Sequence, residues 1–177
     1  MATRPATELD RLLERLEKQQ GPLDIEFPDQ VALEISKVFR VRADEVAVME
    51  ISPKGKVLKF VLPTKLQTVG SIPLTSTTAL AARTARERRT DILNNFASSR
   101  HASVFEGVPL DGRQGESIQK IMSVPIVQGD RVIGVAQISR KGNSTADSGP
   151  DFTSKDLSEL QGLNAALGRF LALRRID

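Results

Sequence analysis

The spacing of apolar residues near the start of the chain predicts two helices. Thr7 and Asp10 can cap the first, and Gly21 with Pro22 ends it. Between them, leucines recur at the three- and four-residue intervals of one helix face, at Leu9, Leu12, Leu13 and Leu16. Asp29 is the predicted cap of the second helix, whose inner face is made by Val31, Ile35 and Val38.

The period then becomes that of β-strands. Two runs, 45–51 and 56–62, flank the sequence Ser-Pro-Lys-Gly, which is a hairpin signal. A helix is predicted over 77–89 and a short strand over 91–93. From residue 94 to residue 117 no period survives, and a loop of this length in a compact domain is typical of a lid, a binding loop or disorder.

A second hairpin is predicted for residues 120–141, KIMSVPIVQGDRVIGVAQISRK, around its Gly-Asp turn. Alternation in its second strand places Ile133, Val135 and Gln137 on one face, and the opposite face takes Val132, Gly134, Ala136 and Ile138. Both faces are apolar, so we expect both to be covered, with Gly134 small where a packed helix comes close. Gln137 needs a hydrogen-bond partner, either a backbone or water group in the core or a ligand beside the sheet.

The chain then reads as a flexible linker over 141–150 and a final helix from Ser154 to about Arg174. Thr153 is the predicted N-cap, with Asp156 completing a capping box. Phe152 and Leu157 occupy the two positions of a hydrophobic staple around this cap. The helix has a wide apolar face with several small residues that allow close approach.

The run IMSVPIVQGDRVIGVAQIS, followed by a variable loop and FTSKDLSELQGL, resembles the second half of a GAF domain, and the whole resemblance covers roughly residues 25 to 175. It implies an α+β fold with a central antiparallel sheet of about six strands. Terminal helices would pack on one face, and a loop-rich pocket side would form the other. On this reading residues 1–24 are an N-terminal helical arm, and residues 25–177 are the GAF-like domain with its long C-terminal helix.

Members of this family that bind cyclic nucleotides often carry Asn-Lys, a spacer, then Phe, three residues and Asp-Glu. Lys141, Phe152 and Asp156 match this motif, whereas Arg140 and Leu157 depart from it. The motif braces the family's pocket through a Lys-Asp pair, so its partial presence says little about cyclic nucleotides.

The resemblance places any ligand against the aperiodic segment from 94 to 117. The amides of Asn94 and Asn95 could project from the sheet edge, and Arg100 could meet an anionic group. Phe96 and Phe105 could form apolar walls, as small-molecule sites require. With Gln137, these are the predicted ligand-binding residues. The alternative is a surface loop that the two phenylalanines anchor to the core.

Composition removes several classes of function. The 177 residues include no cysteine, which excludes thiol catalysis and thiolate metal sites and fits a reducing compartment. His101 is the single histidine, so zinc is not expected, and no G-x-S-x-G, P-loop or dinucleotide motif occurs. The net charge of +3 and the 4% aromatic content argue against nucleic acid. No apolar run reaches the roughly 18 residues of a membrane helix.

The basic run over 83–89 has two interpretations. One is a solvated helix face on which Arg83 pairs with Glu87, with Arg88 and Arg89 at a helix C-terminus. The other is a site for an anionic ligand or partner.

We therefore expect a non-catalytic, cytoplasmic sensory or regulatory module that binds an unidentified small molecule and signals through its terminal helices. The alternative is an interaction or dimerisation module whose pocket is filled by its own side chains. A homodimer through the terminal helices is expected, because the first leucine stripe and the last helix offer more apolar surface than one sheet consumes. The output would pass to a separate protein, and no cofactor is specified.

Overall fold

The computed structural model describes residues 7–96 and 117–174. Its helices and strands are, in chain order, α1 (Glu8–Lys18), α2 (Phe27–Phe39), β1 (Val46–Ile51), β2 (Val57–Leu62), β3 (Ser71–Pro73), α3 (Leu80–Glu87), β4 (Asp91–Leu93), β5 (Ser117–Gln128), β6 (Arg131–Gly142), α4 (Ser154–Gly162) and α5 (Asn164–Arg174). Short 3-10 helices are η1 (Ala43–Glu45), η2 (Thr64–Thr68) and η5 (Ala146–Ser148).

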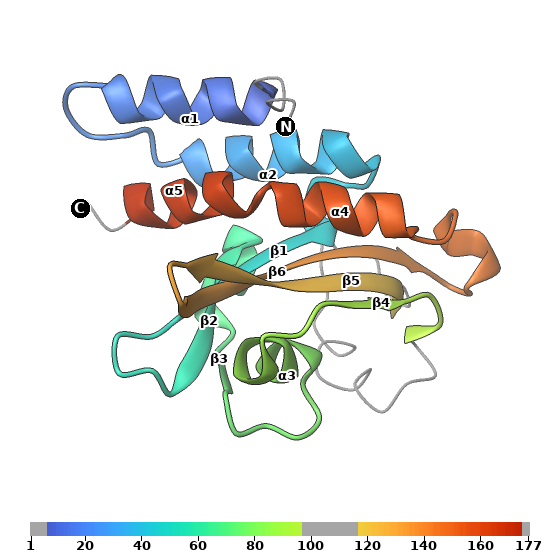
Figure 1. Ribbon diagram of the computed structural model, residues 1–177. Helices are drawn as coiled ribbons and strands as arrows, with labels where there is room; N and C mark the ends of the chain where they lie inside the picture. Colours follow the sequence, from blue (N-terminus) through green and yellow to red (C-terminus); the bar gives the residue numbers. More distant parts are fainter. Residues whose placement is uncertain (1–6, 97–116, 175–177) are drawn as a thin grey trace.

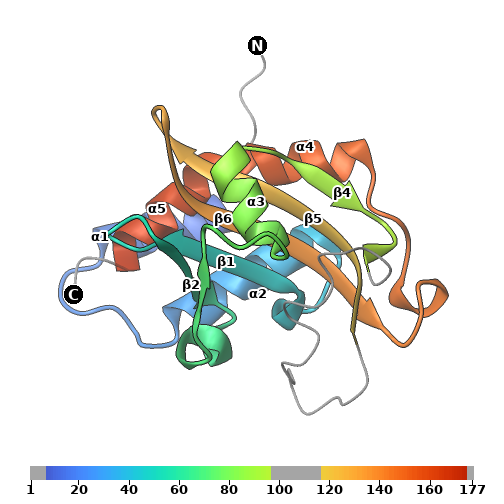
Figure 2. The ribbon, with the colours of Figure 1, turned by 90° about the horizontal axis from the view of Figure 1, so that it is seen from below.

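The strands form one antiparallel six-stranded sheet in the order β3-β2-β1-β6-β5-β4. Helices α2, α4 and α5 lie along one face of the sheet, and α3 lies on the other (Figure 1). The view from below shows α3 across β5 and β6 (Figure 2). The predicted α+β fold class is confirmed, and both predicted hairpins are present.

The larger core lies between the sheet and the helix layer. Its strand side chains include Val48, Met122 and Ala136, and Phe27 and Phe170 meet edge-on in the helix layer with their ring centroids 6.1 Å apart. Helix α1 lies over α2 and α5 (Figure 1). Its stripe is buried in this same core, with exposed fractions of 1% for Leu9, 6% for Leu12, 0% for Leu13 and 7% for Leu16. These leucines, which were predicted to contact a second copy of the chain, are therefore buried within the chain itself.

The predicted start and inner face of α2 need correction. The helix begins at Phe27 with Glu26 as N-cap, and Asp29 lies inside the first turn, where it accepts a hydrogen bond from Thr64. Pro28 favours this earlier start because proline is suited to the first helical turn. Val38 is 37% exposed, and Phe39 is buried in its place at the end of the helix.

A β-bulge corrects the predicted faces of β6. Ile126 pairs with Gly134 but the next residue of β5, Val127, pairs with Val132, so Ile133 is an extra residue. The bulge turns Ile133 toward the helix layer and Val132 toward α3, opposite to the simple alternation. From Gly134 onward the predicted faces are correct.

The crowding at Gly134 also has a different source from the one expected. A Cβ atom built there would lie 2.3 Å from the backbone oxygen of Met49. The close neighbour is therefore strand β1, which carries its own register shift between Val48 and Met49, and not a helix.

The C-terminal segment is divided into two helices where one was predicted. Helix α4 ends at Gly162, and α5 begins at Asn164. The Asn164 amide donates to the backbone oxygen of Val127 and accepts from its N–H, both at 2.8 Å, at the β-bulge. This pairing gives α5 its own start.

Residues 141–150, which were expected to be a flexible linker, contain the 3-10 helix η5. Lys120 Nζ donates a hydrogen bond to the backbone oxygen of Gly149 in this segment, at 2.6 Å.

Candidate functional site

A buried chain of hydrogen bonds links the centre of the sheet to α3. Gln137 Nε2 donates to Ser123 Oγ at 3.1 Å, and Ser123 Oγ lies 2.7 Å from Thr84 Oγ1. Thr84 Oγ1 donates to the backbone oxygen of Leu80 at 3.0 Å. Each hydroxyl has one proton, so the Thr84 donation requires Ser123 to donate to Thr84. All three bonds therefore run in one direction, from Gln137 to the first turn of α3.

This polar chain lies inside an otherwise apolar layer. Thr84 and Ser123 are fully buried, and Gln137 is 3% exposed. Ser123 and Gln137 are opposite each other in the β5–β6 ladder, so their side chains share the face that α3 covers. The apolar cluster between α3 and the sheet includes Met49, Ala81 and Val135. Burying this many polar atoms is tolerated because each hydroxyl is hydrogen-bonded.

The partner of Gln137 is thus a serine side chain, which neither sequence alternative named. Ser123 and Thr84 were missed as well. A signal was present, since Ser123 is the single polar residue of the run IMSVPIV and Thr84 interrupts an alanine-rich helix. Gln137 bonds Ser123 through its amide nitrogen, and within the described residues its carbonyl oxygen accepts no hydrogen bond, so this oxygen is an available acceptor on the α3 face.

Of the other predicted site residues, Asn94, Asn95 and Phe96 belong to the described part of the chain. Asn94 donates to the backbone oxygen of Phe152 at 3.0 Å and accepts from its N–H at 2.9 Å, so its amide holds the start of α4. Asn95 is exposed. Phe96 is 1% exposed and packs with Leu80 and Ile121 on the α3 face. Arg100 and Phe105 lie outside the described residues.

The residues of the partial cyclic-nucleotide motif make other contacts than the family's Lys-Asp pair. Lys141 Nζ donates to the backbone oxygen of Asp44 at 3.0 Å. Asp156 forms the predicted capping box with Thr153, which confirms the local explanation of these residues. The Arg140 guanidinium lies 4.6 Å from the ring centroid of Phe152, a cation–π contact beside the Asn94 bonds.

The arginines of the basic run over 83–89 form ion pairs and hydrogen bonds with other residues of the chain. Arg83 pairs with Glu87 at 3.2 Å, as predicted for a solvated helix face. Arg86 donates to the backbone oxygen of Ser76 at 3.1 Å, and Arg88 donates to that of Asp130 at 3.0 Å. These contacts favour the structural interpretation of the run over an anion site.

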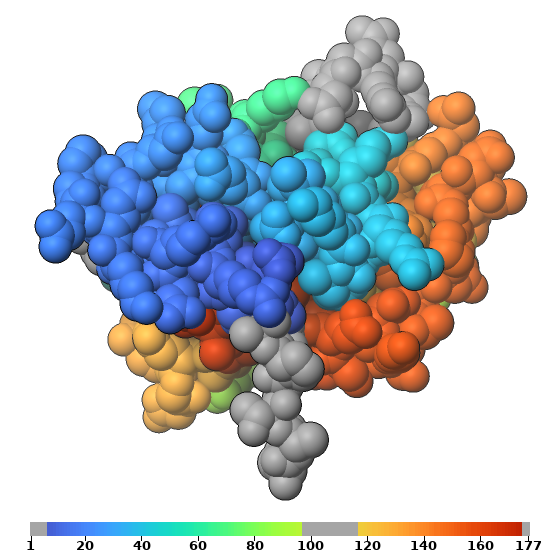
Figure 3. All heavy atoms as spheres, turned by 90° about the horizontal axis from the view of Figure 1, so that it is seen from above, coloured from blue at the N-terminus to red at the C-terminus, as the bar shows by residue number. Residues whose placement is uncertain are grey.

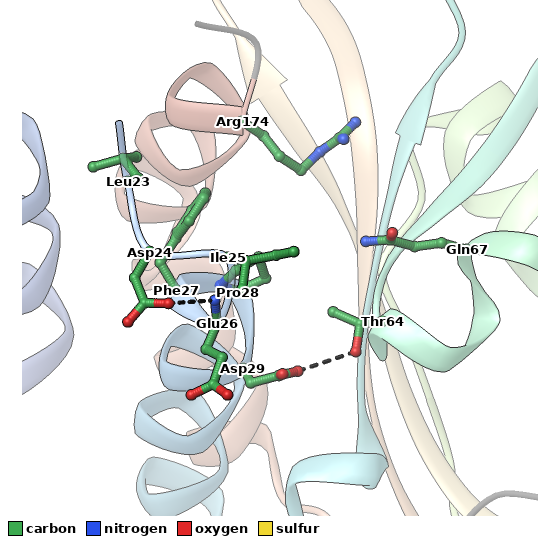
Figure 4. A pocket seen from close by; sticks show the side chains of 10 residues that line it. All are labelled: Leu23, Asp24, Ile25, Glu26, Phe27, Pro28, Asp29, Thr64, Gln67 and Arg174. Atoms are coloured by element: carbon green, nitrogen blue, oxygen red, sulfur yellow. Dashed lines mark hydrogen bonds between the residues drawn. The ribbon is translucent and has the colours of Figure 1, made fainter. Parts of the chain in front are cut away.

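A separate cavity of about 510 Å³ lies at the start of α2, near the end of α5. Asp29 and Thr64 are joined by a hydrogen bond at one side of this gap, and Ile25 projects across it toward Gln67 (Figure 4). Arg174 extends into the opposite side of the gap (Figure 4) and is ion-paired with Glu50. Among the described residues, the predicted site residues Asn94, Asn95, Phe96 and Gln137 do not line this cavity.

Two further classes of site receive no support from the described part of the chain. Within residues 7–96 and 117–174, no three histidine, cysteine or acidic side chains are grouped closely enough to hold a metal ion. Among the described helices, none is both long and apolar enough to cross a bilayer.

The comparisons with known proteins agree with this architecture. Among solved structures, the GAF domain of an Acinetobacter phosphoenolpyruvate-protein phosphotransferase is 16% identical, with a TM-score of 0.64, over 96% of this chain and 93% of that chain. Residues 122 to 287 of a methyl-accepting chemotaxis protein are 12% identical, with a TM-score of 0.63, over 92% and 96% of the two chains.

An enzyme is also among the similar structures. The free methionine-R-sulfoxide reductase from Neisseria meningitidis, solved with its substrate, is 15% identical, with a TM-score of 0.59, over 96% of this chain and 89% of that chain. At these identities the structures establish the fold alone.

No curated protein sequence matches the chain. A GAF domain family model matches residues 37–172, more than half of the chain. The chain therefore belongs to the GAF domain family, whose members include regulatory ligand-binding modules and some enzymes.

Proposed function

We propose that the chain is a non-catalytic sensory module that binds a small molecule on the α3 face of its sheet. The observation that carries this proposal is the directed hydrogen-bond chain from Gln137 through Ser123 to Thr84. It connects the central strand β6 to the helix that covers this face. A ligand that hydrogen-bonds to the Gln137 amide would therefore act on a side chain already coupled to α3.

The non-catalytic part of the proposal rests on the residues available for chemistry. The sulfoxide reductases of the GAF family work through cysteines, and this chain has none. The hydroxyls of Ser123 and Thr84 are fully buried, and both donate hydrogen bonds along the chain. They are therefore poor candidates for nucleophiles, because neither has an adjacent base to activate it. We further propose that the module works in the cytoplasm and passes its state to a separate protein.

A second candidate is an interaction module whose ligand face is filled by its own side chains. The observation in its favour is Phe96, which is 1% exposed and packs on Leu80 and Ile121. This ring occupies part of the face where the sensor would hold its ligand. The two candidates differ in whether a small molecule is retained by the folded protein.

Native mass spectrometry of the protein purified from its own host tests the proposal. The sensor predicts a bound small molecule that Gln137→Leu releases. Gln119→Leu is the matched control, because Gln119 is also a buried glutamine, but its amide already contacts Gly142 and Thr145. A ligand-free wild-type protein favours the interaction module.

Hydrogen exchange then reports whether residues 94–117 respond to the ligand. If the segment closes over the site, its amides become protected when the retained compound is added back to stripped protein. Equal exchange in both states, with binding confirmed by calorimetry, would place the ligand elsewhere, with the cavity beside Arg174 as the next position to test.

A further inference from the structure

Three polar side chains form a row across the α3 face of the sheet. Ser123 of β5 pairs with Asp91 of β4 on one side and with Gln137 of β6 on the other, so the three residues share one face. Seen from above, the opposite face of the sheet is hidden beneath the helix layer, with α1, α2 and α4 at the surface (Figure 3). This polar row therefore lies on the side of the sheet that the helix layer leaves to α3.

The carboxylate of Asp91 is buried, and one of its two oxygens has a partner. The side chain is 10% exposed, and Oδ1 lies 3.3 Å from Nε of Arg89, whose side chain is 53% exposed. Oδ2 is fully buried and accepts no hydrogen bond from the described residues. A buried polar atom without a partner is unfavourable, because folding has removed the water that would hydrate it. Asp91 therefore needs a hydrogen-bond donor that the described part of the chain does not supply.

Ser123 lies opposite Asp91 but has no proton to donate to it. Its one hydroxyl proton is donated to Thr84, whose own proton goes to the backbone oxygen of Leu80. Gln137 donates to Ser123, and within the described residues its carbonyl oxygen accepts no hydrogen bond. The direction of these bonds thus uses both hydroxyl protons and leaves two acceptors on the face, Asp91 Oδ2 and Gln137 Oε1.

The arginines of the basic run do not satisfy the second oxygen of Asp91. Arg83 is in an ion pair within α3, and Arg86 and Arg88 donate to backbone oxygens. Arg89 contacts the other oxygen from a half-exposed position. Charges interact more strongly away from bulk water, so the carboxylate of Asp91 should attract a cationic group on this face and repel a carboxylate or phosphate.

We propose that the small molecule bound on the α3 face carries an organic ammonium group, which donates a hydrogen bond to Asp91 Oδ2. An ammonium group has the opposite charge to Asp91 and offers only donors, which is what the two remaining acceptors require. A second donor on the same molecule would meet Gln137, which lies two strand spacings, or roughly 10 Å, across the sheet from Asp91. The proposal rests on the proposed function, because without a small-molecule site this oxygen would be left to water.

Three probes of one shape test the charge preference. Benzylammonium, benzyl alcohol and benzoate are cationic, neutral and anionic at neutral pH, and all carry the same ring. Compounds of this size bind on the order of 1 mM, so NMR amide chemical shifts of the full chain are followed during titration. We expect benzylammonium to bind most tightly and benzoate least tightly, with the shifted amides in α3, β4 and β5.

Asp91→Asn keeps the shape of the side chain and removes its charge. It should weaken the binding of benzylammonium about tenfold and leave that of benzyl alcohol nearly unchanged. Asp147→Asn is the matched control, because it removes the same charge from an exposed position on η5. Thermal unfolding without a probe verifies that both variants fold. The order of the three probes on the wild type decides the question if Asp91→Asn does not fold.

The outcomes separate this proposal from the proposed function. Benzyl alcohol or benzoate binding on the α3 face at least as tightly as benzylammonium overturns the ammonium assignment and leaves the small-molecule site in place. Benzoate as the tightest probe would favour the anionic ligand that the sequence suggested through Arg100. An unchanged affinity of Asp91→Asn for benzylammonium also overturns the assignment. If no probe binds on the α3 face, the result counts against both, and native mass spectrometry then tests the proposed function by itself.

Discussion

Gly134 lies where strands β6 and β1 approach each other so closely that a side chain does not fit. Its position on β6 faces the backbone oxygen of Met49 on β1, at a distance that no Cβ atom tolerates. Two register shifts lie close to this point, one in the β1–β2 pair between Val48 and Met49 and one in the β5–β6 pair between Ile126 and Val127. A Cβ atom has no room here, so the site requires glycine for space and not for an unusual φ angle.

Gly134→Ala should therefore destabilise the protein by about 1–3 kcal/mol, because the backbone of β1 or β6 must shift to admit the methyl group. Gly168→Ala is the matched control, since a Cβ atom at this helical glycine meets nothing within 4 Å. That substitution should stabilise the protein by up to about 1 kcal/mol through helix propensity. Urea unfolding of both variants measures the two changes, and a neutral Gly134→Ala would contradict the crowding at this site.

Helices α1 and α4 begin with local hydrogen bonds, whereas a tertiary contact lies at the division between α4 and α5. Thr7 with Asp10 and Thr153 with Asp156 form complete capping boxes at the starts of α1 and α4. The division between α4 and α5 has a distant cause, because Asn164 pairs with the backbone of Val127. Residues close in sequence thus define the starts of α1 and α4, and a hydrogen bond between distant residues lies at the division between α4 and α5.

Thr153→Ala should cost about 1 kcal/mol of stability through loss of the α4 cap. The first amides of α4 should also exchange faster with solvent, because their hydrogen-bond acceptor is gone. Thr153→Ser retains the hydroxyl and should retain most of the stability. Chemical denaturation and hydrogen exchange test this pair, and equal losses in the two variants would show that packing of the methyl group, not capping, is responsible.

At the scale of the whole molecule, α1 is joined to the rest of the chain by two kinds of contact. Its leucines are buried between α2 and α5, whereas Arg169 of α5 donates a hydrogen bond to Glu17 at its surface. That hydrogen bond lowers the pKa of Glu17 and raises that of Arg169. Both side chains are more than a third exposed, so solvent screens the pair and the leucines contribute most of the stability.

The Glu17 pair should give a small pH-dependent contribution. A carboxylate whose pKa is lowered by folding stabilises the protein above its unfolded pKa, near 4.3, and this stabilisation disappears as pH falls through the folded pKa. Glu17→Gln should thus cost less than about 1 kcal/mol at neutral pH and less than that at about pH 3, where a larger share of the Glu17 carboxyl group is protonated. Leu13→Ala should cost about 2–5 kcal/mol at both. Urea unfolding at the two pH values measures this, and an equal Glu17→Gln effect at both would exclude the ion pair as its cause.

Much of this fold could be read from the sequence, because its signals lie within a few residues of one another. Apolar spacing marked the strands of both hairpins, and capping residues marked the starts of α1 and α4. The pattern around Gln137 also placed that residue correctly on the face opposite Ala136 and Ile138. The family resemblance of the second half came from the same short-range order, and the family is confirmed.

The rest was decided by contacts between residues far apart in the chain. Ser123 meets Gln137 because β5 and β6 pair in one register, and Thr84 joins them only because α3 packs on that face. Asn94 holds Phe152, 58 residues away, and so serves the start of α4. The leucines of α1 were predicted to contact a dimer partner, whereas the structure buries them against α2 and α5. A buried apolar or hydrogen-bonding side chain can be satisfied by many different partners. The sequence therefore determines that such a side chain needs a partner, and only the tertiary structure determines which residue that partner is.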